Sequence, residues 1–431
     1  MRILIISTFF PPLNSIASLR PYSWAKYWTL EGHDVTVLTT QKQQDPTLAL
    51  NLPNPGFELI EVPLPSLFHS LKNRCQATSK KDENNPEKKG NTPQINFLQT
   101  LRRKKGIFHA CRMPDITHFW TRPAFRKIRE KGNWDLVVSS SGPYTVHIVA
   151  EKLKKSGFAK KWVADFRDRW SDNHIFPGLF PFTLVEKIWE KKLMKSADAI
   201  TTVSTPYSNT FKAKYGSEKV HVIENGFDPE DLENIPKIPI FLDDGKFRII
   251  YTGSLFLRNQ NPEPFFKTIA KMKQDPKNQN LLEKLEVIFV GPEQQTLERL
   301  INQYQIEKWV KTLGFVNREV SLRMQRDAHA VLFFPWNDST VDGINTGKVF
   351  EYLYSKTPIL CVGEKNHQSI QQLIHESKTG VTLTTTEEIE SYLIDHLQNT
   401  SKQPTTIPSS ILERYSRKEL ASQFLKISKL L

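Results

Sequence analysis

Cysteine is scarce in this chain, and long apolar runs are missing. The 431 residues include only Cys75, Cys111 and Cys361, far apart and without metal-site spacing. A disulfide framework is therefore not expected, and a reducing compartment fits best. No segment approaches the roughly 18 apolar residues that span a bilayer, and the opening MRILIISTFFPP lacks the pattern of a signal peptide. We expect a cytoplasmic protein, or one that rests on the inner face of a membrane.

The composition excludes the disordered and collagen-like classes, because 39% of the residues are apolar and 24% are charged. The length predicts two or three domains. The net charge of +13 calls for an anionic partner, which is nucleic acid, acidic lipid or a phosphorylated ligand. Nucleic acid is the weakest of these, since the chain shows no zinc knuckle, RNP-type strand or helix-turn-helix pattern.

Short apolar strands alternate with helical patterns along both halves of the chain. This alternation predicts an α/β protein with two facing, doubly wound Rossmann-like domains and a ligand cleft between them. The expected strands of the first half are 3–7, 35–39, 135–139, 162–165, 199–203 and 220–223, and those of the second half are 247–251, 285–290, 331–334 and 358–361.

The domain boundaries follow from changes in composition. Residues 1–235 form the first domain, interrupted by a polar insertion at about 64–100 that lacks periodicity and is expected to be mobile. A polar connection, 228–245, serves as a hinge, and 246–408 form the second domain. Residues 409–431 read as one amphipathic helix that packs back toward the first domain.

Three stretches of the second half share the order and character of a known site. They are VIENGFD at 222–228, IIYTGSLFLRNQNP at 249–262 and GINTGKVFEYLYSKTPIL at 343–360. The first half adds FFPPLNSIASLR, GHDVTVLTT, SSSGPYTVH and WVADFRDRW. Together they resemble the family 4 glycosyltransferases of the two-domain GT-B type, in particular enzymes that build bacterial surface polysaccharides. The resemblance covers nearly the whole chain except the insertion.

The resemblance implies a nucleotide-sugar donor site in the second domain. Gly253 lets the backbone approach the ligand closely, and Thr346-Gly347 opens a helix whose amides face a pyrophosphate. Arg258 and Lys348 are the expected catalytic cations that stabilise the leaving phosphate, and Glu351 accepts hydrogen bonds from the ribose. The remaining residues expected at this site are Ser254, Phe315, Asp342 and Asn345.

Two positions depart from the family pattern. Ser254 stands where many relatives carry a second arginine, and Gly343 stands where they carry a donor-site glutamate. Asp342 is the neighbouring substitute for that glutamate. The alternative for Arg258, Lys348 and Glu351 is that all three are ordinary surface side chains.

The first domain holds the expected acceptor side. Many relatives carry a cleft histidine after the strand WVAD, where this chain has Asp165 and Asp168 among arginines. Asp168 is the candidate for orienting or deprotonating the acceptor, and a structural Asp–Arg pair is the alternative. Further acceptor-side candidates are Asn14, Ser15, Ser141 and Gly142, for which turns and helix caps are the alternative.

The implied activity is transfer of a sugar to a lipid-linked or growing surface glycan, with retention of anomeric configuration and without a metal or cofactor. An epimerase of the same fold and a non-catalytic scaffold that binds nucleotide sugars remain as alternatives. A nicotinamide-dependent dehydrogenase is weaker, because no G-x-G-x-x-G follows the first strand.

Residues 101–131 are strongly basic, with ten lysines and arginines against Asp115 and Glu130, and with Phe108, Phe119, Trp120 and Phe125 interleaved. Basic and aromatic residues together favour an anionic membrane surface. The alternative is a solvated helix face beside a few core aromatics.

Overall fold

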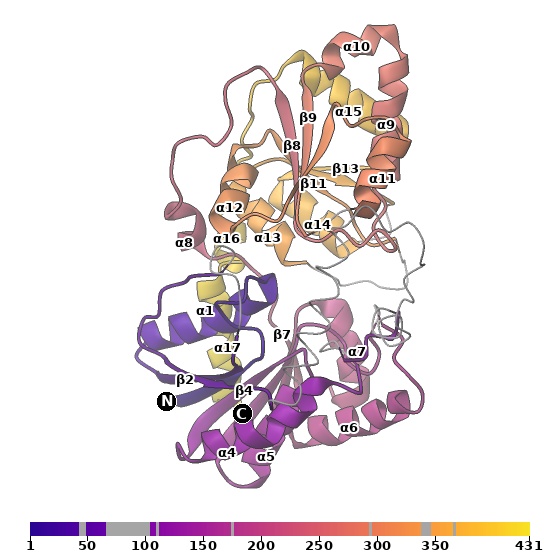
Figure 1. Ribbon diagram of the computed structural model, residues 1–431. Helices are drawn as coiled ribbons and strands as arrows, with labels where there is room; N and C mark the ends of the chain where they lie inside the picture. The colour runs from indigo at the N-terminus through magenta and orange to yellow at the C-terminus, as the bar shows by residue number, and fades with distance from the viewer. Residues whose placement is uncertain are drawn as a thin grey trace, which may run out of the picture. The chain divides into compact units, whose positions relative to one another are not determined.

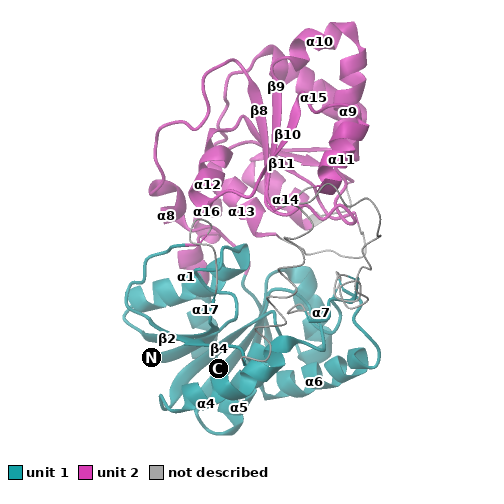
Figure 2. Ribbon diagram, viewed as in Figure 1, with its two compact units in different colours: residues 1–44, 51–223, 421–431 teal, residues 45–50, 224–420 magenta. Residues whose placement is uncertain are grey.

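The computed structural model describes residues 1–42, 49–65, 104–108, 112–173, 176–292, 295–337, 346–364 and 368–431. The expected insertion lies outside these residues from position 66 onward. The chain divides into two compact units (Figure 2): unit 1 holds most of residues 1–223 together with 421–431, and unit 2 holds most of residues 224–420.

Unit 1 is built on a parallel sheet. Its strands run in the order β3-β2-β1-β4-β5-β6-β7, so the chain moves outward from β1 in both directions, as in a doubly wound fold. Its elements are β1 (Arg2–Ile6), α1 (Ile16–Leu30), β2 (Asp34–Thr40), β3 (Glu58–Val62), η2 (Ile116–Trp120), α4 (Thr121–Arg129), β4 (Trp134–Ser141), α5 (Thr145–Lys155), β5 (Ala159–Phe166), α6 (Phe182–Ser196), β6 (Ala199–Thr202), α7 (Thr205–Tyr215) and β7 (Val220–Val222).

Helices cover both faces of this sheet (Figure 1). Right-handed crossovers place α1 on one face and α4, α5, α6 and α7 on the other. Helix α1 is buried over most of its circumference, so it needs cover on the side away from the sheet as well. Phe424 supplies it, with its ring 4.8 Å from that of Trp24 and 5.5 Å from that of Trp28.

Unit 2 repeats the design with strand order β10-β9-β8-β11-β12-β13, again parallel. Its elements are α8 (Pro229–Glu233), β8 (Phe247–Thr252), α9 (Glu263–Gln274), α10 (Pro276–Leu282), β9 (Leu285–Val290), α11 (Gln295–Gln303), β10 (Val310–Gly314), α12 (Arg318–Asp327), β11 (Ala330–Phe333), α13 (Gly347–Ser355), β12 (Ile359–Val362), α14 (Gln368–Ser377), β13 (Gly380–Leu383), α15 (Thr386–Gln398) and α16 (Ser409–Arg414). The predicted fold class, two doubly wound α/β sheets, is confirmed.

The division between the units falls at Ile223–Glu224, earlier in the chain than the hinge expected from composition. Contacts with unit 2 explain the difference. The Phe227 ring stacks on that of Tyr354 at 4.3 Å, and Asp231 forms an ion pair with Arg318. The beginning of the expected hinge is therefore part of unit 2.

The end of the chain forms two helices, where the sequence suggested one. Between α16 and α17 (Arg417–Leu430), the backbone turns aside to pair with Phe227: the Phe227 amide donates to the Tyr415 carbonyl at 3.1 Å, and the Arg417 amide donates to the Phe227 carbonyl at 2.8 Å. Helix α17 begins in unit 2, and from Ala421 onward its residues belong to unit 1. The Trp28 indole donates to the Ala421 carbonyl at 3.0 Å.

A buried ion pair joins the carboxyl ends of the unit 1 strands. Arg20 of α1 donates to both oxygens of Asp165 at the end of β5, at 2.8 and 3.2 Å. The hydroxyls of Ser140 and Thr201, on the two neighbouring strands, donate to the same carboxylate at 2.8 and 2.9 Å. One buried carboxylate therefore holds α1, β4, β5 and β6 in register.

Replacing one partner of this pair should destabilise unit 1. Asp165→Asn leaves the Arg20 charge buried without a counterion, which costs about 3–5 kcal/mol of unfolding free energy. Asp168→Asn is the matched control, because Asp168 is exposed three residues along the same segment, and it should change stability by no more than about 0.5 kcal/mol. Chemical denaturation followed by tryptophan fluorescence measures both. Equal stabilities of the two variants would contradict the role given to the pair.

Candidate functional site

In unit 2, the expected donor-site residues gather at the carboxyl edge of the sheet. Gly253 follows β8, Phe315 follows β10, and Thr346 caps α13. Asp342 and Asn345, like Gly343, lie outside the described residues, so their placement stays a prediction.

Lys348 lies directly beside the turn that follows β8. Its ammonium donates to the Tyr251 hydroxyl at 2.6 Å and to the Ser254 carbonyl at 3.2 Å, and it lies 4.1 Å from the centre of the Tyr251 ring. Burial lowers the pKa of Lys348 to about 7, although Glu351 acts in the opposite direction. Burial also raises the pKa of Tyr251, so its phenol stays protonated. Lys348 is therefore poised between its charged and neutral forms.

Gly253 is required where it stands. Its φ is +92°, in the left-handed region that favours glycine. A Cβ added at Gly253 would lie 3.5 Å from both Cε and Nζ of Lys348. The missing side chain therefore keeps the space in front of the ammonium open.

The N-cap residue of α13 does not cap the helix with its side chain. Thr346 makes no side-chain capping hydrogen bond, and its buried Oγ1 has no hydrogen-bond partner among the described residues. The free amides of the first turn and the positive end of the helix dipole therefore remain available to an anion.

Glu351 uses only one of its two carboxylate oxygens in contacts with the described residues. It is 8% exposed, and its Oε1 accepts a hydrogen bond from Arg318 Nη1 at 2.7 Å. Arg318 donates with its other terminal nitrogen to Asp231 at 2.6 Å. The second carboxylate oxygen of Glu351 has no hydrogen bond to any residue that the structure describes, so it can accept one from a ligand.

Arg318 and Asp231 are not among the site residues that the sequence predicts. Arg318 lies at the start of α12, just after the carboxyl end of β10, which is the one signal that could have pointed to it. Its two partners are 33 and 87 residues away in the chain, and no local pattern connects them.

Arg258 and Phe315 are presented to solvent. Arg258 lies in the turn after β8, is exposed, and makes no hydrogen bond or ion pair with another described residue. Phe315 is 44% exposed, beyond Gly314 at the end of β10. Both are free to contact a ligand.

In unit 1, most acceptor-side candidates have structural roles. Asp165 is saturated by Arg20, Ser140 and Thr201, so the structural Asp–Arg alternative describes it. Ser15 is the N-cap of α1, where its side chain accepts from the Ala17 amide at 3.3 Å. Asn14, just before this cap, is half-buried and has polar or ring contacts of its own.

The turn after β4 is also held by the protein itself. The Ser141 hydroxyl donates to the Asp165 carbonyl at 3.2 Å, while Arg167 donates to the Ser141 and Gly142 carbonyls at 2.7 and 3.2 Å. His147, in the quoted stretch SSSGPYTVH, is a core residue whose pKa burial lowers to about 3. Asp168 remains the exposed carboxylate at the end of β5, without a hydrogen bond or ion pair to a described residue.

The basic stretch 101–131 divides into core and surface. Arg112 is buried and forms an ion pair with Glu186 at 2.7 Å, Trp120 is fully buried, and Phe125 packs against the same core. These three residues were expected on the basic surface, but each of them packs in the protein interior instead. Residues 101–103 and 109–111 lie outside the described residues. Arg122, Arg126, Lys127 and Arg129 of α4 are exposed, as are Phe108 and Phe119.

Two negative findings apply to the described residues only. None of their helices is both long enough and apolar enough to cross a membrane. Within the same residues, no group of three or more His, Cys, Asp and Glu side chains is arranged to hold a metal ion.

Comparison with known structures shows the fold. Sucrose-phosphate synthase from Thermosynechococcus elongatus matches with a TM-score of 0.63 at 14% identity, over 99% of this chain and 98% of that one. Trehalose-6-phosphate synthase OtsA matches with a TM-score of 0.61 at 10% identity, over 100% and 99% of the two chains. WaaG, a glycosyltransferase involved in lipopolysaccharide biosynthesis, matches with a TM-score of 0.54 at 13% identity, over 98% and 95%.

Sequence comparison agrees with this result. No curated protein matches the chain in sequence, but residues 21–231 match the model of Glycosyltransferase Family 4. The match begins within α1 and ends within α8, and it includes strands β2 to β7 of unit 1. The chain is therefore a glycosyltransferase of the GT-B fold, and its residues 21–231 match Glycosyltransferase Family 4.

Proposed function

We propose that the enzyme transfers a hexose or a related sugar from a nucleotide-sugar donor to a growing, lipid-linked surface glycan, in the cytoplasm at the inner face of the membrane. The observation that carries the donor assignment is a cluster of three features: Lys348, the uncapped amino end of α13, and Glu351 with one carboxylate oxygen available. A solved structure of similar fold, trehalose-6-phosphate from E. coli, is bound with UDP-2-fluoro glucose, which is an analogue of a donor of this class.

Each part of the cluster has a task toward such a donor. The diphosphate lies against the first-turn amides of α13, with Lys348 and Arg258 as countercharges and Gly253 leaving room for it. The free oxygen of Glu351 accepts a ribose hydroxyl, while Arg318 holds the other oxygen and fixes the rotamer. Phe315 offers an exposed ring near the base. Asp342 and Asn345 belong to the same proposed site.

The proposed reaction retains the anomeric configuration and uses neither metal nor cofactor. The bond between the anomeric carbon and the diphosphate oxygen breaks, and the acceptor oxygen bonds to that carbon on the same face. The acceptor proton passes to the departing phosphate, so no protein nucleophile is needed. Lys348, Arg258 and the helix dipole stabilise the charge that develops on the leaving group. Asp168 is the proposed orienting group for the acceptor hydroxyl.

Loss of the Glu351 carboxylate should weaken nucleotide binding. In a thermal-shift panel of nucleoside diphosphates and nucleotide sugars, one base family should stabilise the wild type. Glu351→Gln should weaken its binding by about 1.5–3 kcal/mol, or roughly 10- to 150-fold in Kd, because a charged hydrogen bond is lost. Asp231→Asn is the control, since it also disturbs Arg318 but removes no proposed ligand contact. Absence of any nucleotide shift in the wild type would refute the donor site.

Nucleotide affinity should depend on pH through Lys348. The folded-state pKa of about 7 lies below the ordinary value of about 10.4, so the free amine is largely neutral at pH 8 and must take up a proton to bind a diphosphate. Kd should therefore rise toward tenfold per pH unit above pH 7. By the same linkage, Lys348 destabilises the free protein near neutrality, and its contribution improves as pH rises between the two pKa values.

Lys348→Met is the control for this pH dependence. Its affinity should be weaker and nearly independent of pH above 7, apart from any titration of the nucleotide itself. Calorimetry in buffers of different ionisation enthalpy counts the proton taken up. If wild type and variant had the same pH profile, Lys348 would not be the group that binds the diphosphate.

The proposal includes peripheral attachment to anionic membrane. It is supported by the exposed cations of α4 and by the exposed Phe108 and Phe119. Co-sedimentation with vesicles of phosphatidylcholine, alone or mixed with phosphatidylglycerol, should show binding that requires the anionic lipid and declines as salt rises. Equal binding to both kinds of vesicle would contradict it.

A further inference from the structure

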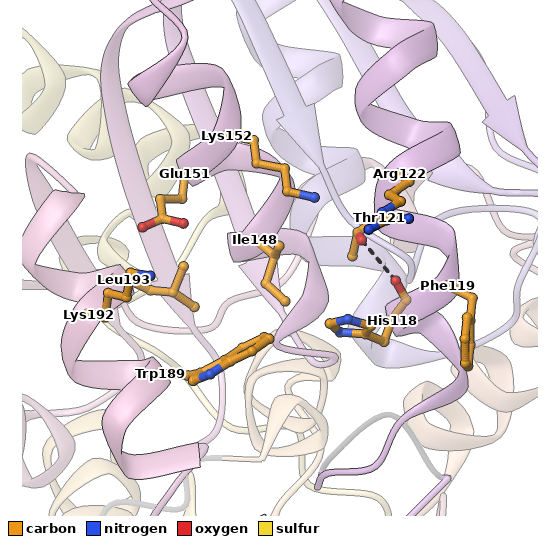
Figure 3. Close-up of a pocket in the computed structure, with 10 residues that line it drawn as sticks. All are labelled: His118, Phe119, Thr121, Arg122, Ile148, Glu151, Lys152, Trp189, Lys192 and Leu193. Atoms are coloured by element: carbon orange, nitrogen blue, oxygen red, sulfur yellow. Dashed lines mark hydrogen bonds between the residues drawn. The ribbon is translucent and has the colours of Figure 1, made fainter. Parts of the chain in front are cut away.

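Unit 1 contains a pocket of about 500 Å³ that the sugar-transfer proposal does not use. It is lined by helices only: His118 and Phe119 of η2, Arg122 of α4, Lys152 of α5, and Trp189 and Lys192 of α6 are prominent in its wall (Figure 3). The residues considered for sugar transfer in this unit instead follow the ends of strands. The pocket is thus a separate feature.

The pocket carries positive charge that the protein does not neutralise. The side chains of Arg122, Lys152 and Lys192 make no hydrogen bond or ion pair with any residue that the structure describes. The one acid in the wall, Glu151, is bound to Lys155 at 2.5 Å. Partial burial and the charge of Arg122 both lower the pKa of Lys152, while Glu151 acts in the opposite direction. An anion would neutralise the charge of these cations.

The floor and walls of the pocket are partly apolar. The rings of His118 and Trp189 lie with their centres 5.7 Å apart and their planes tilted by 45°, and Ile148 and Leu193 add apolar surface to the lining. In Figure 3 the Lys152 side chain extends from α5 toward Arg122, above these rings. A ligand that fits must therefore present an anionic group to the cations and apolar surface to the rings.

Outside the pocket, helix α6 and the residues just before it also combine exposed cations with exposed apolar side chains. Both of its glutamates are buried: Glu186 pairs with Arg112, and Glu190 accepts from the Ser171 amide at 2.8 Å and from the Tyr215 hydroxyl at 2.7 Å. Its exposed charges are consequently all lysines, at positions 187, 191, 192 and 195. Between and before them, Ile188, Leu184 and Phe180 are 66%, 52% and 75% exposed.

We propose that this pocket binds the phosphate headgroup of an anionic membrane lipid, with Arg122, Lys152 and Lys192 around the phosphate and with Phe180, Leu184 and Ile188 entering the acyl region. A membrane lipid matches both halves of the surface, whereas a free phosphate would leave the apolar residues without a partner. This inference rests on the membrane part of the proposed function and gives it a defined binding site on α4, α5 and α6.

The test compares two double variants of the full chain that lose the same charge. Arg122→Gln with Lys152→Gln removes pocket cations, while Arg126→Gln with Lys127→Gln removes exposed cations of α4 that do not line the pocket. Binding to mixed phosphatidylcholine and phosphatidylglycerol vesicles should fall for both, because each cation near the surface contributes attraction. The pocket variant should lose about tenfold more affinity than the α4 variant, since it also loses direct phosphate contacts.

Two further measurements separate the outcomes. Glycerol 3-phosphate, which carries the headgroup chemistry without acyl chains, should neither stabilise the protein nor displace it from vesicles. Leu184→Ser with Ile188→Ser should weaken vesicle binding without altering charge. Equal losses in the two charge variants, or tight binding of glycerol 3-phosphate, would overturn the lipid site. Nucleotide stabilisation should survive in every variant, so failure of the lipid site remains distinct from failure of the donor site.

Discussion

The buried pair between Arg20 and Asp165 fixes the geometry of unit 1 at the edge where its strands end. A charged carboxylate is tolerated there because an arginine and two hydroxyls satisfy it fully. Arg20 also donates to the carbonyl of Ile223, the last residue of unit 1 before the chain passes into unit 2. The same pair therefore sets the strand ends, the position of α1 and the position of the last residue of unit 1 before the division.

Unit 2 also contains an arginine paired with carboxylates, but here the pairing leaves one carboxylate oxygen available to a ligand. Arg318 holds Glu351 on one side and Asp231 on the other, and it leaves one oxygen of Glu351 unused. A fully satisfied acid, such as Asp165, can only support the fold, whereas a partly satisfied one retains capacity for a ligand. The number of hydrogen bonds that the protein supplies to each carboxylate thus separates structural acids from functional candidates.

Much of the fold could be predicted from the sequence, because apolar strands such as 3–7 and 247–251 and intervening helical patterns are local signals. The start of α13 at Gly347 and the turn at Gly253 were predictable for the same reason. The ion pair between Asp165 and Arg20 could not be predicted from local sequence signals, since Arg20 lies 145 residues earlier in the chain. Arg112 has the sequence context of a surface cation, but α6 brings Glu186 to it from 74 positions further along the chain, a contact that only the tertiary structure creates.

The path of α17 has a consequence for how the protein is made. Residues from Ala421 onward complete the cover of α1, yet they are synthesised only after the whole of unit 2. Until Phe424 arrives, Trp24 and Trp28 lack the aromatic cover that makes them fully buried in the finished fold. Unit 2 is nearly continuous in the chain and can close on itself first, so the domain that is synthesised first is the one that finishes folding last. The tryptophans of α1 therefore stay incompletely covered throughout the synthesis of unit 2.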